Sequence, residues 1–128
     1  MEIEKTFYTD ELIRIGEKHW DLHDQAVLKH FNFLERYEVI LNENSITISI
    51  IIIKENFRNK GYGTEILNKI CWYADENKLQ IQLTPTQYFG SDMNKLILFY
   101  KKFGFVENKG KNKINTLSHK MYRNARIV

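Results

Sequence analysis

A short segment in the middle of the chain combines two glycines with two cations. In RNKGYG, Arg58 and Lys60 stand beside Gly61 and Gly63, although the 128 residues contain only six glycines. Because glycine adopts positive φ and has no side chain to obstruct a ligand, such a loop can curl until several backbone N–H groups converge on one anion. Arginine and lysine add positive charge beside it. The segment therefore predicts a phosphate-binding loop.

The sequence on either side of this loop favours the same interpretation. Residues 46–53 read ITISIIII, which is typical of a buried strand, and residues 61–77 place their apolar side chains on one face of a helix. A helix that begins where a strand ends offers unpaired N–H groups and the positive end of its dipole to an anion. On the glycines alone, a plain strand-to-helix turn would explain the segment equally well. The two cations and the helix that follows favour phosphate binding.

Two other phosphate-binding motifs do not fit this segment. The Walker motif requires a Gly-Lys-Ser/Thr order that is absent. The dinucleotide fingerprint requires a third glycine three residues after Gly63, where Ile66 stands. Neither a nucleoside-triphosphate loop nor a dinucleotide loop is therefore expected.

Hydrophobic periodicity predicts a single α/β domain over residues 1–128, with a mixed central sheet flanked by helices. The isoleucine strand has no polar face and should lie in the interior of that sheet. Residues 91–103 are apolar on most sides and predict a well-buried helix. The full set of expected elements is a strand at 1–7, one or two helices at about 10–34, a hairpin of 37–41 and 45–53, a helix at 61–77, a strand at 79–84, a helix at 91–103, and strands at 103–107 and 115–123.

Composition narrows the class of protein. Hydrophobic residues make up 43% and charged residues 27%, as in ordinary soluble domains. The longest apolar run is far shorter than the roughly 20 residues of a membrane helix, and the first residues lack the apolar core of a secretory signal. Cys71 is the only cysteine, so no internal disulfide can form, and its place on the apolar face of a helix predicts burial. We expect a soluble, cytoplasmic protein without a membrane partner.

Positive charge gathers at the end of the chain. The net charge is +3, and residues 106–128 hold six Lys or Arg residues against one acid, Glu107. Such a segment can dock phosphates or nucleic acid. The favoured interpretation is a solvated basic edge, which also discourages association of strands. Because Tyr122 is the only aromatic residue there, a base-stacking surface for nucleic acid is not indicated.

The loop and a second motif together resemble the GCN5-related N-acetyltransferase (GNAT) superfamily. RNKGYG matches its Arg-x-x-Gly-x-Gly pattern after a strand, and LILFYKKFGF (residues 96–105) is similar to its Leu/Phe-Tyr-x-x-x-Gly-Phe signature. The resemblance extends from about Tyr37 to Val106, and more loosely to the end. It implies a GNAT acyl-CoA N-acyltransferase fold. It also implies transfer of an acetyl group from acetyl-CoA, the co-substrate, to a primary amine by direct attack.

The same resemblance implies roles for particular residues. The open edge of the isoleucine strand, at Ile51 and Ile53, would pair with the pantetheine arm, and the N–H near Ile53 would polarise the thioester carbonyl. Tyr100 would be the general acid that protonates the departing thiolate. The loop that would bind the pyrophosphate through its backbone comprises Arg58, Asn59, Lys60, Gly61, Tyr62, Gly63 and Thr64.

Some positions depart from the family pattern. Met93 and Leu96 stand where many members carry an asparagine and a small residue, and Asn94 is one position away. Thr47 stands where some protein-acetylating members carry a glutamate, so we assign no general base. A bound water or an amine that arrives neutral would serve equally well. Three carboxylates lie near the site in sequence: Glu38, Glu43 and Glu55.

The N-terminal helices offer no metal site and no acceptor motif. His19 and His23 are four residues apart and His30 follows, but a third ligand of suitable spacing is not evident, so no metal is expected. We expect this region to shape the pocket of an unidentified amine acceptor in a monomer or homodimer. Because no base is assigned, a catalytically silent acyl-CoA-binding module with the same fold remains the alternative function.

Overall fold

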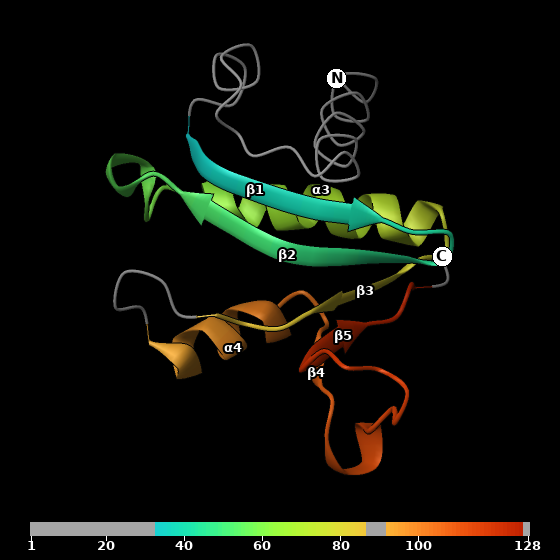
Figure 1. The fold of residues 1–128 in the computed structure, drawn as a ribbon. Coiled ribbons are helices and arrows are strands. Elements are labelled where there is room, and N and C mark those ends of the chain that lie inside the picture. The colour runs from blue at the N-terminus through green and yellow to red at the C-terminus, as the bar shows by residue number, and fades with distance from the viewer. Residues whose placement is uncertain (1–32, 87–91, 127–128) are drawn as a thin grey trace.

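The computed structural model describes residues 33–86 and 92–126 (Figure 1). The predicted first strand, the three N-terminal histidines and nearly all of the predicted helical region at 10–34 lie outside these residues. Leu34, which we placed at the end of that region, begins a strand instead. The elements are β1 Leu34–Leu41, β2 Ser45–Ile53, the 3₁₀ helix η1 Glu55–Phe57, α3 Tyr62–Glu76, β3 Gln80–Leu83, α4 Met93–Lys101, β4 Val106–Glu107, the 3₁₀ helix η2 Gly110–Asn112, and β5 Met121–Arg123.

The described strands form one mixed sheet in the order β1-β2-β3-β5-β4. Strands β1 and β2 form the predicted antiparallel hairpin, which turns at residues 42–44. Strand β3 pairs with β2 in parallel, and β5 pairs antiparallel with both β3 and β4. Helix α3 makes the crossover between β2 and β3 that a parallel pair requires.

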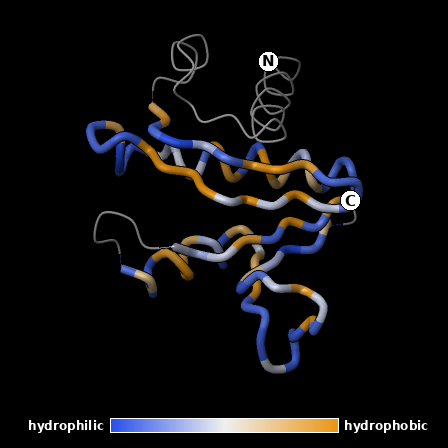
Figure 2. Tube along the Cα trace, viewed as in Figure 1, coloured by the Kyte–Doolittle hydropathy of each residue, from blue (hydrophilic) through white to orange (hydrophobic). Residues whose placement is uncertain are grey.

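The isoleucine strand lies in the interior of the sheet, as its sequence predicted. Strand β2 has β1 on one edge and β3 on the other, and it is apolar along most of its length in Figure 2. Successive residues of this strand, from Ile46 to Ile48, are buried, so both faces of the sheet are covered there. Ser49 is the exposed exception within the strand.

The hydrophobic core lies between this sheet and α3, which passes behind β1 and β2 in Figure 1. The helical face predicted from the sequence is the buried one, because apolar residues at spacings of three and four share one side of a helix. Facing it are Ile46 and Ile48 of β2 and Ile81 and Leu83 of β3. None of the helices within the described ranges is long and apolar enough to cross a membrane. The buried residues of α3 are Ile66, Leu67, Ile70, Cys71 and Ala74.

Helix α4 differs from its prediction. Asp92 caps it, since its Oδ1 accepts a hydrogen bond of 2.8 Å from the Asn94 backbone N–H. Gly104 ends the segment with φ of +96°. However, none of the helical residues is fully buried, and Leu98 is 59% exposed. The prediction of a well-buried helix was wrong because one side of α4 packs on the core while the other lies outside it.

The final strands are shorter than predicted. Strand β4 covers Val106–Glu107, instead of 103–107, and β5 covers Met121–Arg123, instead of 115–123. The residues between these two strands fold around the buried side chain of Asn108. Its Nδ2 donates to the carbonyl oxygens of Leu117 and His119 at 3.1 and 3.0 Å, and its Oδ1 accepts from the Ile114 N–H at 2.7 Å. These bonds hold the segment as a loop instead of a strand.

A buried ion pair joins the last strand to the end of α3. The Arg123 guanidinium, 3% exposed, donates to both carboxylate oxygens of Asp75 at 2.9 and 3.0 Å. Its Nε donates to the Phe103 carbonyl oxygen at 2.7 Å. Burial raises the pKa of Asp75, but the hydrogen bonds from Arg123 and from the Arg126 N–H outweigh it, and the pKa lies below its ordinary value. Arg123, one of the six basic residues at the end of the chain, therefore stabilises the fold.

We expect Asp75→Ala to lower the free energy of unfolding by about 3 kcal/mol at pH 7, because it leaves the Arg123 charge buried without a partner. Since folding depresses the pKa of Asp75, the stabilisation is complete above the unfolded value of about 3.9 and is lost as pH falls through the folded value. Urea unfolding followed by circular dichroism from pH 7 to pH 3 measures both effects.

The matched control is Glu65→Gln, which removes the 3.5 Å pair between the exposed Glu65 carboxylate and Lys69 on the same helix. It should cost less than about 0.5 kcal/mol. An Asp75→Ala variant as stable as this control would show that the buried pair does not hold β5 to α3.

Candidate functional site

Strands β2 and β3 separate halfway along β2. Their parallel pairing runs from Ser45 and Gln80 to Ile48 and Leu83 and then stops. On the other edge of β2 the register with β1 shifts at the same place, so that Ser49 is an extra residue, as in a β-bulge. On the β3 side, Pro85 follows two residues after the strand ends and has no N–H to continue the ladder.

The separation leaves backbone groups of β2 directed at an edge that β3 does not occupy. The Lys54 N–H donates to the Phe33 carbonyl oxygen at 2.9 Å, which makes Ile53 a non-hydrogen-bonded position of the β1–β2 ladder. Its own N–H and C=O therefore point away from β1. Because backbone direction alternates along a strand, those of Ile51 point the same way. These are the two residues whose backbone the sequence resemblance selected.

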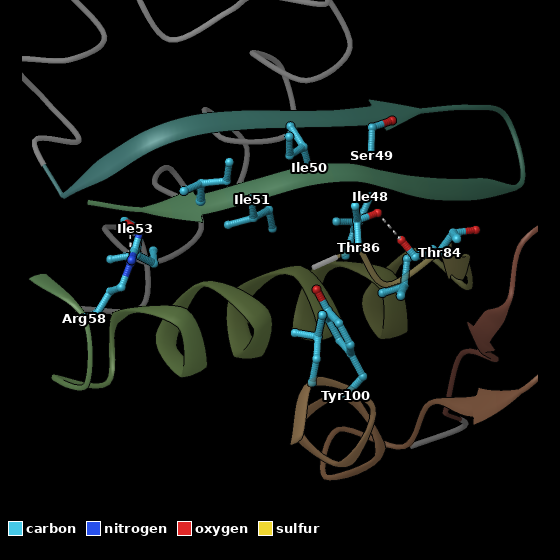
Figure 3. Close-up of a pocket in the computed structure, with 12 residues that line it drawn as sticks. Ile48, Ser49, Ile50, Ile51, Ile53, Arg58, Thr84, Thr86 and Tyr100 are labelled. Carbon is cyan, nitrogen blue, oxygen red and sulfur yellow. Dashed lines mark hydrogen bonds between the residues drawn. The ribbon is translucent and has the colours of Figure 1, made fainter. Parts of the chain in front are cut away.

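A cavity of about 260 Å³, the strand cavity, occupies this separation. Figure 3 shows Tyr100 rising from α4 with its hydroxyl oxygen directed toward β2, and Arg58 beside Ile53 at the strand end. The cavity wall is mostly apolar, as ligand sites usually are. Its lining residues are 48–53 of β2 together with Arg58, Leu83, Thr84, Thr86, Leu96 and Tyr100.

The glycine loop curls between β2 and α3 as predicted. Asn59 and Gly61 both have left-handed backbones, with φ of +61° and +86°, and α3 begins directly afterwards at Tyr62. A side chain at Gly61 would meet no atom within 4 Å, so the space beside its Cα is open. Arg58 is held to the strand end, because its Nε donates to the Ile53 carbonyl oxygen at 2.9 Å.

A second cavity of about 450 Å³, the loop cavity, lies at the mouth of this loop. Five residues line both cavities, so the two adjoin: Ile51, Ile53, Arg58, Leu96 and Tyr100. Every loop residue predicted to bind a coenzyme lines the loop cavity except Lys60, which is exposed outside it. The complete lining is Ile51, Ile53, Phe57, Arg58, Asn59, Gly61, Tyr62, Gly63, Thr64, Leu67, Leu96, Phe99 and Tyr100.

Aromatic packing fixes the walls of the loop cavity. The Tyr62 ring stacks on Phe33, with centroids 4.6 Å apart, and meets the edge of Phe57 at 5.8 Å. A side chain at Gly63 would lie 3.8 Å from the Phe99 ring, which is an ordinary van der Waals distance, so a Cβ would fit there. Neither backbone conformation nor crowding therefore requires a glycine at position 63, whereas the φ of Gly61 reflects the curl of the loop.

Tyr100 stands where the two cavities meet. Its ring packs edge-on against Phe99 and Phe105, with centroids 5.5 and 5.6 Å away. These contacts hold the ring while its hydroxyl end faces the cavity (Figure 3). Of the positions that depart from the family pattern, Leu96 lines both cavities, whereas Met93 and Asn94 line neither.

None of the three candidate carboxylates lines either cavity. Glu38 pairs with Arg36 at 2.8 Å on β1, Glu43 is exposed in the hairpin turn, and Glu55 is exposed in η1. The described residues also contain no group of three or more His, Cys, Asp or Glu side chains that could hold a metal ion. Proximity in sequence therefore does not place these three carboxylates on either cavity wall.

Sequence reasoning missed the wall of the strand cavity opposite β2. Thr84 and Thr86 line it directly after β3, and Ser49 lines it from the bulge. The sequence signal for this wall was Pro85, the only proline of the chain. Because proline cannot donate to a ladder, it marks where one strand ends while its neighbour continues.

Comparison with known proteins identifies the class of protein. Residues 22–107 match the family model described as "Acetyltransferase (GNAT) domain". The match spans more than half of the chain, and the chain therefore belongs to the GNAT family of acetyltransferases. No relative was found among curated proteins.

Solved structures share the fold at low sequence identity. A GNAT-family acetyltransferase from Staphylococcus aureus Mu50 superposes with a TM-score of 0.52 at 19% identity, covering 93% of this chain and 94% of its own. Ard1 from Thermoplasma volcanium gives 0.51 at 19% identity, covering 94% and 93%. The anti-CRISPR protein AcrVA5 gives 0.51 at 20% identity, covering 66% and 83%. These similarities confirm the mixed-sheet GNAT fold.

We expect Cys71 to be inert in the native protein. Burial raises the pKa of its thiol to about 11, even though the Arg123 charge opposes the rise, and the side chain lines neither cavity. The thiolate is the reactive form, so a disulfide reagent such as DTNB should label less than about a tenth of the native protein in the time that labels all of it in urea. Rapid native labelling would contradict the burial of this face of α3.

Proposed function

We propose that this chain is an acetyl-CoA-dependent N-acetyltransferase that acts by direct attack of a primary amine on the thioester, with Tyr100 as general acid. The observation that carries the proposal is the position of Tyr100. It lines both the strand cavity and the loop cavity, at the place where the edge of β2 that β3 leaves meets the glycine loop. Membership of the GNAT family supports the use of acetyl-CoA.

The loop cavity suits the diphosphate of the coenzyme. Its rim is the left-handed turn through Asn59 and Gly61 and the first residues of α3, whose N–H groups have no partner within the helix. The positive end of the helix dipole and the Arg58 guanidinium favour an anion at this position. Lys60 lies outside the cavity and would act through its charge at longer range.

The strand cavity suits the pantetheine arm, whose two amides can pair with β2 like an added strand. Ile51 would contribute its N–H and C=O. Ile53 would contribute its N–H, while its carbonyl oxygen accepts the hydrogen bond from Arg58 Nε. This arrangement lets one arginine serve both as the anchor of the strand end and as a cation beside the phosphates.

The chemistry that follows uses the direction of these groups. Backbone N–H groups of the β2 edge polarise the thioester carbonyl in a largely apolar wall, where a fixed dipole stabilises the developing oxyanion more than in water. As the amine attacks, the C–S bond breaks and Tyr100 transfers its proton to the coenzyme sulfur. A phenol, with an ordinary pKa of about 10, can protonate a thiolate when the two are within hydrogen-bond distance.

A catalytically silent coenzyme-binding module is the second candidate. None of the carboxylates that sequence proximity suggested as a base lines the strand cavity or the loop cavity, and this favours the silent module. The two candidates differ in one result. A silent module binds acetyl-CoA without releasing thiol in the presence of any amine, whereas an enzyme releases thiol with at least one of a panel of polyamines, aminoglycosides, amino acids and lysine peptides.

We expect Gly61→Ala to weaken acetyl-CoA binding about fivefold, because an L-residue at φ of +86° costs about 1 kcal/mol and the loop would relax away from its curl. Isothermal titration calorimetry measures the Kd. Gly110→Ala is the matched control, since Gly110 also has positive φ, +58°, but lines neither the strand cavity nor the loop cavity. Equal weakening by both variants would mean that strain, not the loop, affects binding.

We expect Tyr100→Phe to lower kcat by about 10²-fold while leaving the Kd for acetyl-CoA within about twofold, because only the proton donor is removed. Thiol release and calorimetry measure the two quantities. Tyr73→Phe makes the same change on α3 at a residue that lines neither the strand cavity nor the loop cavity, and it should retain kcat. Unchanged turnover in Tyr100→Phe would remove the acid from the mechanism.

A further inference from the structure

The strand cavity has a polar wall that the proposed roles above do not use. Thr84, the first residue after β3, lines the same cavity as Tyr100 and Ser49. It lies on the side opposite the β2 edge, where the coenzyme would pair. An amine that reaches the thioester must lose a proton, and among the described residues no carboxylate lines this cavity to receive it.

Thr84 is connected to the only histidine in the described part of the chain. Its Oγ1 lies 3.2 Å from the His119 Nδ1. The same oxygen accepts a hydrogen bond of 3.3 Å from the Lys120 backbone N–H. When Nδ1 is unprotonated, the Thr84 hydroxyl hydrogen is therefore directed toward the imidazole, and the oxygen keeps a lone pair for a second donor.

The loop holds His119 at this position through a buried side chain. Asn108, 9% exposed, donates from Nδ2 to the His119 carbonyl oxygen at 3.0 Å and braces the residues before it. The phenol of Tyr122 donates to the Asn112 carbonyl oxygen at 2.6 Å. A partly exposed imidazole on a braced loop can pass a proton to solvent without moving.

The charged surroundings of His119 are sparse. Thr84 is its ring partner, and the neighbouring charge in sequence is Lys120. None of the ion pairs between residues of the described ranges includes His119. No carboxylate within the described ranges pairs with the imidazole, so the Thr84 hydroxyl is the partner of its Nδ1.

We propose that Thr84 and His119 form the proton relay that deprotonates the acceptor amine, with His119 as the base and Thr84 as the carrier. This inference rests on the proposed acetyl transfer. The ammonium gives a proton to Thr84 Oγ1 while the Thr84 hydroxyl proton passes to His119 Nδ1. The neutral amine then attacks the thioester carbon, and the imidazolium returns its proton to solvent through Nε2. Histidine suits this step because it changes charge between pH 5 and 8.

The test is the pH dependence of kcat/KM for the most rapidly acetylated amine of the panel. In the wild type, kcat/KM should rise between pH 5 and 8. His119→Gln keeps a group that can bond to Thr84 but cannot take the proton. We expect kcat/KM of this variant to lie about 10²-fold below that of the wild type at pH 7. The difference should shrink as pH rises and nearly vanish near pH 10, where the amine itself is neutral.

Thr84→Val should reproduce that profile, and Thr84→Ser should recover most of the loss. The double variant His119→Gln/Thr84→Val should be no slower than either single variant, because groups that act as a unit are not additive. Ser118→Ala, an exposed change beside His119 on the same loop, is the control and should keep the wild-type profile. Circular dichroism at each pH verifies that the variants are folded.

The outcomes separate this proposal from the proposed function. An active wild type whose pH profile is unchanged in His119→Gln overturns the relay and leaves the acetyltransferase intact. A loss that is equal at pH 7 and pH 10 also overturns the relay, because it indicates a structural role for His119. A wild type that binds acetyl-CoA but acetylates no amine at either pH overturns the proposed function and the relay together.

Discussion

The separation of β2 from β3 after Ile48 and Leu83 determines where a ligand can bind in this protein. Backbone N–H and C=O groups in a protein interior require partners, and in a sheet the neighbouring strand supplies them. Here the bulge at Ser49 turns β2, and Pro85 cannot extend β3, so the ladder ends while β2 continues for five residues to Ile53. The result is a strand edge inside the molecule that an extended ligand can complete. Every other feature of the site is arranged around that edge.

Packing at the two ends of α3 keeps this opening in place. At its beginning, Arg58 ties the preceding loop to the Ile53 carbonyl oxygen at the end of β2. At its far end, Asp75 receives both arms of the Arg123 guanidinium, which also bonds to the Phe103 carbonyl after α4. Helix α3 is thus tied at its beginning to the end of β2 and at its end to β5 and the turn after α4.

The two walls of the strand cavity have different chemistry, which suits a reaction between two substrates. The β2 wall offers backbone dipoles and isoleucine side chains, suited to an extended amide chain. The opposite wall offers hydroxyl groups, from Thr84 and Thr86, with an imidazole behind the first. Tyr100 lies with the second wall, on α4, and faces the first. In the proposed reaction, such a division would give each substrate its own side and leave the reacting bond between them.

Local patterns in the sequence were sufficient to predict the elements whose packing depends on their own hydrophobic periodicity. The hairpin, the interior position of β2, its bounds at 45–53 and the buried face of α3 were all predicted from the sequence, because each depends on residues a few positions apart. The glycine loop was predicted for the same reason. The sequence also identified Tyr100 and the loop residues that line a cavity, apart from Lys60, through two short motifs, although their roles stay predictions.

Tertiary structure alone decided what depends on distant partners. Asp75 and Arg123 are 48 residues apart, and Thr84 and His119 are 35 apart, so no periodicity connects them. The final strands shortened because Asn108 captures the backbone of the loop, and a side chain that bonds several carbonyls leaves no trace in hydropathy. Helix α4 was expected to be buried because it is apolar on most sides. Apolar content, however, reports how much surface can be covered and does not report whether a neighbour covers it. The sequence determined which segments could form strands and helices, and the folded chain determined which of their edges stayed open.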